Sequence, residues 1–188
     1  MLDQAKIKEA MQILISALGD DITRPGLLET PERAARMYTE MFEGMNYTND
    51  QIAEMFNKSF EDTDSTEWVL VKDINIFSFC EHHFALMYNM KAHIAYKPQG
   101  RVIGLSKVSR IADMVAKRLQ LQERICADIN YVMQKVTGAK DVMVVIEGEH
   151  SCMTARGIRA QNSKTRSLCA RGVFETDAAL RMEVLSQI

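Results

Sequence analysis

Residues 68–83 read Trp-Val-Leu-Val-Lys-Asp-Ile-Asn-Ile-Phe-Ser-Phe-Cys-Glu-His-His, a strand pattern followed by a cluster of metal-binding residue types. Valine, isoleucine and aromatic residues dominate positions 68–79, which predicts a β-strand that delivers Cys80. Because Cys80 and His83 are three residues apart, they converge on one ion only if the chain turns directly after the strand. The stretch therefore predicts a Cys/His site in the turn at the end of a strand.

A second cluster, His150-Ser151-Cys152, ends another alternating apolar run that starts at Val142. On an extended chain, side chains two residues apart project to the same face, so His150 and Cys152 are expected to point together. Two thiolates and one imidazole suit zinc, and three protein ligands leave a fourth position open for a water that becomes a nucleophile. Hydrolysis is therefore the first functional hypothesis.

A purely structural explanation of the same residues stands beside this hypothesis. Cysteine often behaves as a small buried hydrophobe, and a His-His pair can be a satisfied surface or core feature. The four cysteines are irregularly spaced, which favours free thiols or metal ligands over disulfides in a cytoplasmic protein. We assign Cys126 and Cys169 to packing.

The composition indicates one globular domain with a helical N-terminal arm, because 47% of the 188 residues are hydrophobic. A net charge of −2 makes nucleic acid an improbable main partner. No apolar run is long enough to span a bilayer, and the first residues lack a signal-peptide layout. We therefore expect a cytoplasmic protein without membrane contact.

Helical spacing predicts three helices in the arm. The first covers residues 3–18 and stops at Gly19, the second has Thr30 as N-cap and ends near Gly44, and the third is capped by Asn49 or Asp50. The polar, acidic residues 61–66 predict a solvated connection. We therefore divide the chain into an arm, residues 1–60, and a domain, residues 61–188.

The remaining elements predict an α+β domain. Residues 88–97 alternate as a strand with His93 on its polar face. One helix begins at Ser106, with Leu119 as its last inward residue, and a second runs from Gln122 to Gly138. Strands at 142–150 and 168–174 follow, and a final helix is capped by Asp177. This order favours an antiparallel four-stranded sheet with helices on one face. Its two open edges favour pairing with further copies, as in a ring of subunits.

Two groups of polar residues are candidate ligands for a nucleotide. Gly104-Leu105-Ser106-Lys107 leads into a helix whose first turn, with Arg110 on the same face, suits an anion. Arg156 and Arg159 are further candidates, because guanidinium binds phosphate bidentately. These cations are equally consistent with a solvated surface. Gln122 and Glu123 are either ordinary first-turn residues or, for the glutamate, an acceptor for the N–H groups of a guanine edge.

Several ordered motifs together resemble the GTP cyclohydrolase I family over most of residues 30–175. They are Cys-Glu-His-His (80–83), His-Ile-Ala-Tyr (93–96), Gly-Leu-Ser-Lys (104–107) with Arg110, Arg-Leu-Gln-Leu-Gln-Glu-Arg (118–124) and His-Ser-Cys-Met-Thr-Ala-Arg-Gly (150–157). The resemblance implies a zinc enzyme of the tunnelling fold that converts GTP and water to 7,8-dihydroneopterin triphosphate and formate. It also implies the first step of folate, tetrahydrofolate and other pterin biosynthesis, and a homodecamer with active sites at subunit interfaces.

The resemblance also implies roles for individual residues. Cys80, His83 and Cys152 would bind one zinc per subunit, and His82 and His150 would be catalytic. Gln122 and Glu123 would hold guanine, Ser106, Lys107, Arg110 and Arg156 would hold the triphosphate, and Arg33 would reach a neighbouring subunit's phosphates. The chain departs from the family at residues 84–89, where Phe-Ala-Leu-Met-Tyr-Asn replaces the usual Pro-Phe pair and glycine, and at residues 162–167.

Two other functions compete with this hypothesis. A nitrile reductase of the same fold, acting on a deazaguanine, would need a nucleophilic cysteine and NADPH, and the His150-Ser151-Cys152 ligand arm speaks against it. A non-catalytic, zinc-stabilised oligomer that binds nucleotides as a regulator is the alternative from another class. Formate release from GTP distinguishes both from the cyclohydrolase.

Overall fold

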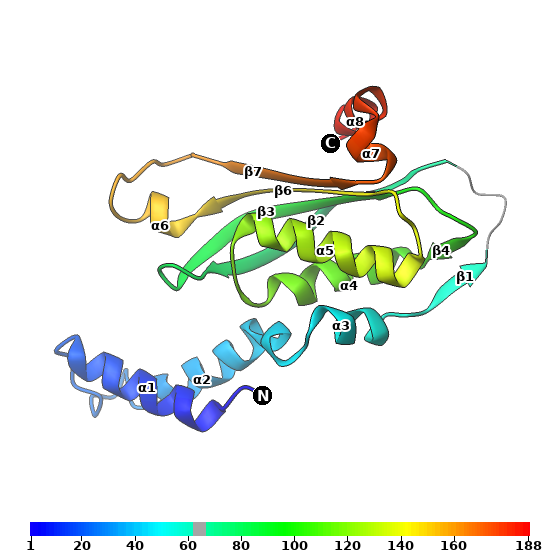
Figure 1. Cartoon of the computed structure of the whole chain (residues 1–188). Coiled ribbons are helices and arrows are strands. Elements are labelled where there is room, and N and C mark those ends of the chain that lie inside the picture. The colour runs from blue at the N-terminus through cyan, green and yellow to red at the C-terminus, as the bar shows by residue number, and fades with distance from the viewer. Residues whose placement is uncertain (62–66) are drawn as a thin grey trace.

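The computed structural model describes residues 1–61 and 67–188, and its elements form a sheet with helices against both faces and a helical arm (Figure 1). The helices are α1 (Gln4–Ala17), α2 (Thr30–Met41), the 3-10 helix η1 (Glu43–Asn46), α3 (Asn49–Met55), α4 (Leu105–Ala116), α5 (Gln122–Thr137), α6 (Ser151–Thr154), α7 (Val173–Thr176) and α8 (Ala178–Leu185). The strands are β1 (Ser59–Glu61), β2 (Val69–Cys80), β3 (Ala85–Tyr96), β4 (Arg101–Ile103), β5 (Leu119–Gln120), β6 (Val142–His150) and β7 (Thr165–Arg171).

The main sheet has five strands in the order β5-β2-β3-β6-β7. The four predicted strands form its antiparallel part, β2-β3-β6-β7. The fourth was predicted at residues 168–174 but runs from Thr165 to Arg171, because the chain turns into α7 at Val173. The prediction of a four-stranded, all-antiparallel sheet was incomplete, because β5 adds a short parallel pairing of Leu119 and Gln120 with Phe79 and Cys80. Leu119 therefore belongs to a strand and not to the preceding helix, which ends at Ala116. β1 and β4 form a separate antiparallel pair.

Helices α4 and α5 cover one face of the sheet, as predicted (Figure 1). Their predicted inward residues are fully buried: Val108, Ile111, Ala112, Val115, Ile125, Ile129, Val132, Met133 and Val136. Gly138 ends α5 in the left-handed conformation that glycine adopts without steric cost. This apolar interface fixes the ends of β2 and β6, from which the candidate site is built.

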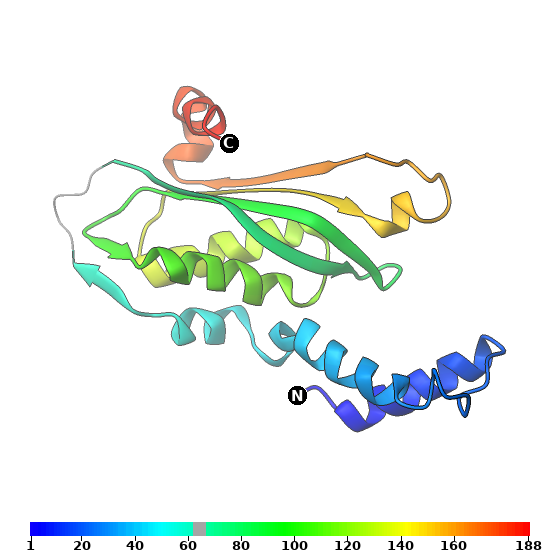
Figure 2. The same cartoon turned by 180° about the vertical axis from the view of Figure 1, so that it is seen from behind.

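The opposite face is not free of helices, which corrects the expectation of helices on one face only. Helices α7 and α8 pack there, as Figure 2 shows from behind, and Asp177 caps α8 as predicted. Phe174 and Val184 join a second apolar cluster with Ala95, Met143 and Val145 of the sheet. Residues 142–146 are an unbroken apolar run, and such runs are typical of strands that are buried on both faces.

His93 was expected on a polar face, but only 3% of its surface is exposed. Its Nδ1 accepts a hydrogen bond from the backbone N–H of Asp73 at 3.2 Å. Asp73 lies at a β-bulge between Val71 and Ile74 and has a φ of 59°. The bulge thus supplies a local partner for the buried imidazole that strand alternation does not predict.

The arm follows the predicted helices, with differences at their ends. Thr30 is the first residue of α2 and Glu29 precedes it, whereas α2 stops at Met41 and η1 takes up the chain around Gly44. Thr48 caps α3, in a capping box with Gln51. Residue 61 ends β1, and residues 62–66 of the predicted connection lie outside the described residues. The boundary between residues 60 and 61 stays a prediction.

Arg118 connects the arm to the domain. Its guanidinium donates to the carbonyl oxygens of Gly44 at 3.0 Å and Tyr47 at 2.9 Å, and to Asn49 Oδ1 at 2.7 Å. Asp128 of α5 lies 3.4 Å from Nη1 and supplies the opposite charge. Burial lowers the pKa of Arg118, and the Asp128 charge opposes that shift. In the described parts of the chain, no helix is long and apolar enough to span a membrane.

Candidate metal centre and active site

The first half of the candidate metal centre is the tight connection between β2 and β3. Cys80 is the last residue of β2 and pairs with Ala85, the first residue of β3, so His83 lies in the turn between them, as predicted. The departure at residues 84–89 is absorbed by backbone irregularities. Phe84 and Asn89 adopt φ values of 52° and 49°, and the β3–β6 register shifts between Tyr88 and Lys91.

The second half comes from the end of β6. The strand ends at His150, and Ser151–Thr154 form one helical turn, α6, so the prediction that His150 and Cys152 share the face of an extended chain was wrong. The helical turn carries the Cys152 thiol to the hairpin instead. The ligand atoms of Cys80, His83 and Cys152 all lie within 4.8 Å of one another, which brings the three predicted ligands together.

The chemistry of this group fits a divalent metal. Cys80 is buried and Cys152 is half-buried, and burial raises the pKa of the Cys152 thiol, with a further rise from the neighbouring Cys80. Two adjacent thiols at low dielectric disfavour ionisation unless a cation balances the charge. A bound metal dication provides that balance, and His83, which is exposed, leaves the group open towards solvent.

His150 and Gln122 form a part-buried polar contact at the site. His150 Nε2 lies 2.8 Å from Gln122 Oε1, and the glutamine is only 1% exposed. Gln122 Nε2 donates to the carbonyl oxygens of Ile146 and Thr165, each at 3.0 Å. Burial lowers the pKa of His150, and the negative charge of Glu123 opposes that shift. Each polar atom of the Gln122 side chain therefore already has a partner within the chain.

Three further predicted residues surround the metal group. His82 is exposed, and its ring lies almost perpendicular to that of His83 with centroids 6.4 Å apart. Glu123 is exposed at the first turn of α5, near enough to His150 to affect its charge. Arg156 follows α6 and exerts a positive field on Cys152. Together they supply one protonatable imidazole, one carboxylate and one cation near the candidate site.

Sequence reasoning missed two contacts that hold this region in place. Glu81, between Cys80 and His82, forms a bidentate ion pair with Arg124 of α5, with distances of 2.6 and 3.1 Å. That hydrogen bonding lowers the pKa of Glu81. On the other side, the hydroxyls of Tyr88 and Thr154 lie 3.0 Å apart and join β3 to α6. Both pairs are distant in sequence, so no local pattern indicates them.

The candidate triphosphate residues Ser106, Lys107 and Arg110 do not join the metal group within one chain. They occupy the first half of α4, whereas the C-terminal end of α4 leads into β5 beside Cys80. The twelve residues of α4 extend about 18 Å. Figures 1 and 2 both place α6 and the start of α4 at opposite ends of the sheet. Lys107 Nζ instead donates to the Lys58 carbonyl at 2.8 Å.

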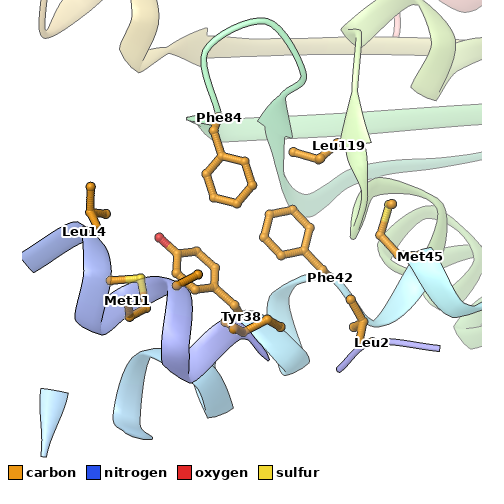
Figure 3. A pocket seen from close by; sticks show the side chains of 10 residues that line it. Leu2, Met11, Leu14, Tyr38, Phe42, Met45, Phe84 and Leu119 are labelled. Carbon is orange, nitrogen blue, oxygen red and sulfur yellow. The ribbon is translucent and has the colours of Figure 1, made fainter. Parts of the chain in front are cut away.

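Arg33 lies on the arm, where it is exposed and forms an ion pair with Glu29 one helical turn away. An apolar hollow of about 390 Å³ lies between the arm and the turn that joins β2 to β3, and Figure 3 shows it from close by. Its lining includes Met11, Leu14 and Tyr38 of the arm together with Phe84. Phe84 directly follows His83, so the arm packs against the turn that carries His83.

Comparisons with known proteins find relatives over nearly the whole chain. A family model described as GTP cyclohydrolase I matches residues 7–188. The GTP cyclohydrolase 1 of Clostridium botulinum (strain Loch Maree / Type A3) is 53% identical, covering 98% of this chain and 96% of that protein. The GTP cyclohydrolase 1 of Ruminiclostridium cellulolyticum is 56% identical, covering 95% of this chain and 94% of that protein.

A solved structure of the archaeosine synthase QueF-Like in its apo form aligns with 59% of this chain and 97% of its own, with a TM-score of 0.45 and 14% identity. The family match and the two clostridial relatives extend over nearly the whole chain. Together with the assembled Cys80, His83 and Cys152, they lead to one conclusion: the chain belongs to the GTP cyclohydrolase I family.

Proposed function

We propose that this protein hydrolyses the imidazole ring of the guanine in GTP and rearranges the ribose, giving 7,8-dihydroneopterin triphosphate and formate. The observation that carries the proposal is the convergence of Cys80, His83 and Cys152 within 4.8 Å, with His150 two residues from Cys152. Family membership supplies the substrate and the reaction. The product would enter folate and other pterin biosynthesis.

The donor set favours zinc, one ion per subunit, because mixed thiolate and imidazole ligands match its preference. When bound, zinc supplies a water of lowered pKa, a nucleophile for C8 of guanine. Burial of the two cysteines and the turn that holds His83 preorganise these ligands. The free thiols of all four cysteines, which lie in the described ranges, support our proposal that the enzyme works in the cytoplasm.

His150 is the proposed proton donor to N7 of guanine, since its imidazole is partly buried and Cys152 follows two residues later. His82, exposed in the same turn as His83, is proposed to relay protons during ring opening and the sugar rearrangement. Glu123 is proposed to accept N–H bonds from the guanine edge. The side-chain nitrogen and oxygen of Gln122 are already hydrogen-bonded within the protein, so we assign the side-chain contact with guanine to Glu123.

The triphosphate is proposed to bind between subunits of a homodecamer. Ser106, Lys107 and Arg110 lie about one helix length from the metal group of the same chain, so one chain does not present both to one GTP. A second copy that brings its α4 start to this metal group completes the site. Arg156 acts from the metal side, and Arg33 of the projecting arm is proposed to reach a neighbouring subunit's phosphates.

Incubation of the purified protein with GTP tests the proposal. Release of formate in step with formation of a pterin that fluoresces after oxidation is the expected result, and it requires both ring hydrolysis and ribose rearrangement. Binding of GTP without formate would instead support a nucleotide-binding regulator. Consumption of NADPH with a nitrile-bearing deazaguanine would support the reductase.

A further inference from the structure

The orientation of the Gln122 amide is determined by its surroundings. Its nitrogen lies 3.0 Å from two carbonyl oxygens, those of Ile146 and Thr165. A carbonyl oxygen only accepts hydrogen bonds, and the amide NH₂ group has two hydrogens to donate. Rotating the amide by half a turn would place its oxygen against two other oxygens, and the Gln122 side chain is only 1% exposed, so that rotated orientation is costly. The oxygen of Gln122 therefore faces His150.

This orientation determines which nitrogen of His150 carries a proton. Gln122 Oε1 has no hydrogen, so the 2.8 Å contact is a hydrogen bond only if His150 Nε2 donates it. A neutral imidazole has one protonated nitrogen, so Nδ1 then holds the lone pair. The contact is half-buried and short, which makes the other tautomer costly because it would oppose two acceptors.

We propose that Gln122 is a positioning residue that holds the His150 ring in the tautomer protonated on Nε2, so that Nδ1 is the nitrogen that exchanges protons with the substrate. The chain builds this device from three elements: α5 provides Gln122, β6 provides Ile146 and His150, and β7 provides the Thr165 carbonyl. The glutamine is thereby assigned to the enzyme's own histidine and not to the guanine. The effect of Gln122 on the reaction rate rests on the proposed function, whereas the tautomer of His150 rests on the hydrogen bonds alone.

Solid-state ¹⁵N and ¹H NMR of the histidine-labelled, zinc-loaded enzyme without GTP reads the tautomer directly. The chain has only four histidines, and His150→Gln identifies the signals of this ring. The expected result is a protonated Nε2 whose proton is protected from exchange with water, and an unprotonated Nδ1. A proton on Nδ1 of neutral His150 in the unmodified protein would overturn the proposal, whether or not any variant folds.

Two matched glutamine variants separate positioning from packing. Gln122→Met keeps the length of the side chain but removes the acceptor, so the Nε2 proton should lose its protection. The kcat for formate release should fall about 10- to 100-fold with little change in KM, a loss of the size seen when a hydrogen-bond partner that orients a metal ligand is removed. Gln120→Met removes a glutamine that is 2% exposed and bonds Asp128, and it should leave the Nε2 proton protected.

The opposite pattern contradicts the proposal. If Gln122 holds guanine, Gln122→Met should raise KM for GTP while the His150 signals stay unchanged. Failure of the unmodified enzyme to release formate would remove the proposed function but would not change the NMR result, so the two failures are distinguishable.

Discussion

The ring of Phe84 packs against the ring of Phe42, with their centroids 5.3 Å apart. Phe42 lies at the junction of α2 and η1, and Phe84 follows the proposed metal ligand His83. Phe79 lies 4.7 Å from Phe42 and 5.7 Å from Phe84, so the three rings form one cluster. Figure 3 shows Phe42 and Phe84 next to each other among the residues that line the apolar hollow. The arm is thus joined by aromatic packing to the turn that holds the metal group.

Replacing Phe42 by alanine should destabilise the protein. Phe42 is 5% exposed, and truncation of a buried phenylalanine costs about 3 to 5 kcal/mol because it leaves a cavity. The free energy of unfolding, measured in urea at a fixed protein concentration, reports this cost. Met45→Ala is the control, because Met45 lines the same hollow but is 49% exposed, and its effect should stay near 0.5 kcal/mol. Equal losses would mean that the cluster does not stabilise the arm.

Cys152→Ala should abolish stoichiometric zinc. The variant leaves one thiolate and one imidazole, too few ligands to hold the ion against competition from water. Elemental analysis of the purified protein is the measurement. Cys169→Ala is the matched control, since this half-buried thiol is not part of the group, and it should retain about one zinc per subunit. Full metal and full activity in Cys152→Ala would end the zinc hypothesis.

His150→Ala should separate catalysis from binding. If His150 supplies the proton to N7, the variant keeps zinc and GTP affinity but loses about 10² to 10⁴-fold in formate release. Zinc content, the Kd for GTP and single-turnover formate release are measured on the same preparation. A histidine with a structural role alone would give a joint loss of metal and stability. Unchanged turnover with normal zinc would remove His150 from the mechanism.

Shared active sites predict that two inactive variants rescue each other. One is Cys152→Ala, which damages the metal half, and the other is Lys107→Ala/Arg110→Ala, which damages the phosphate half. Coexpressed with different tags and purified as mixed oligomers, they should recover about one quarter of the normal activity, because random assortment pairs two intact halves at about that frequency. Mixing the variants without subunit exchange is the control. Mixed oligomers with no activity would place both halves of each site in one chain.

Stability should fall as the pH drops below the ordinary histidine pKa of 6.5, partly because of His93. Burial lowers the pKa of His93, and nearby Arg166 and Lys72 lower it further, while Asp73 and Glu147 oppose the shift. A lowered folded-state pKa means that the unfolded chain binds the proton first, so stability present above 6.5 is lost on acidification.

His93→Gln tests whether His93 causes this pH dependence of stability, since the glutamine oxygen can still accept the hydrogen bond from the Asp73 N–H. Between about pH 8 and about pH 5, the loss of unfolding free energy should be smaller than in the unmodified protein. Urea titrations at both pH values measure it. An identical pH dependence would assign the whole effect to other groups.

The parts of the fold that sequence predicts well are those with a long hydrophobic repeat. Helices α4 and α5 and the strands β2, β3 and β6 each carry enough apolar positions to fix their type. β7 does not, because its Leu168 is 45% exposed, and its predicted span of 168–174 was shifted by three residues. β5 has only two residues, so no period exists to detect it, and its parallel pairing with β2 depends on where α4 ends. The caps at Glu29 and Thr48 differ from prediction by about one residue, as helix ends commonly do.

The candidate site likewise has residues that sequence predicts and contacts that it does not. The three candidate metal ligands are visible in sequence because their residue types are rare and clustered, and the structure brings them together. The contact of Gln122 with His150 and the Glu81–Arg124 ion pair depend on how α5 lies against β2 and β6, which no local spacing encodes. The helical turn at Cys152 was missed because four residues form it without a helical repeat.

The separation of Cys80 and Cys152 along the chain has a further consequence for folding. A dication held by both thiolates closes a loop that contains β3, α4 and α5, and so acts as a removable cross-link. Loop closure lowers the conformational entropy of the unfolded chain most when the enclosed segment is long. A bound dication would therefore stabilise the folded protein by restricting the unfolded chain, and its removal by a chelator should lower the free energy of unfolding.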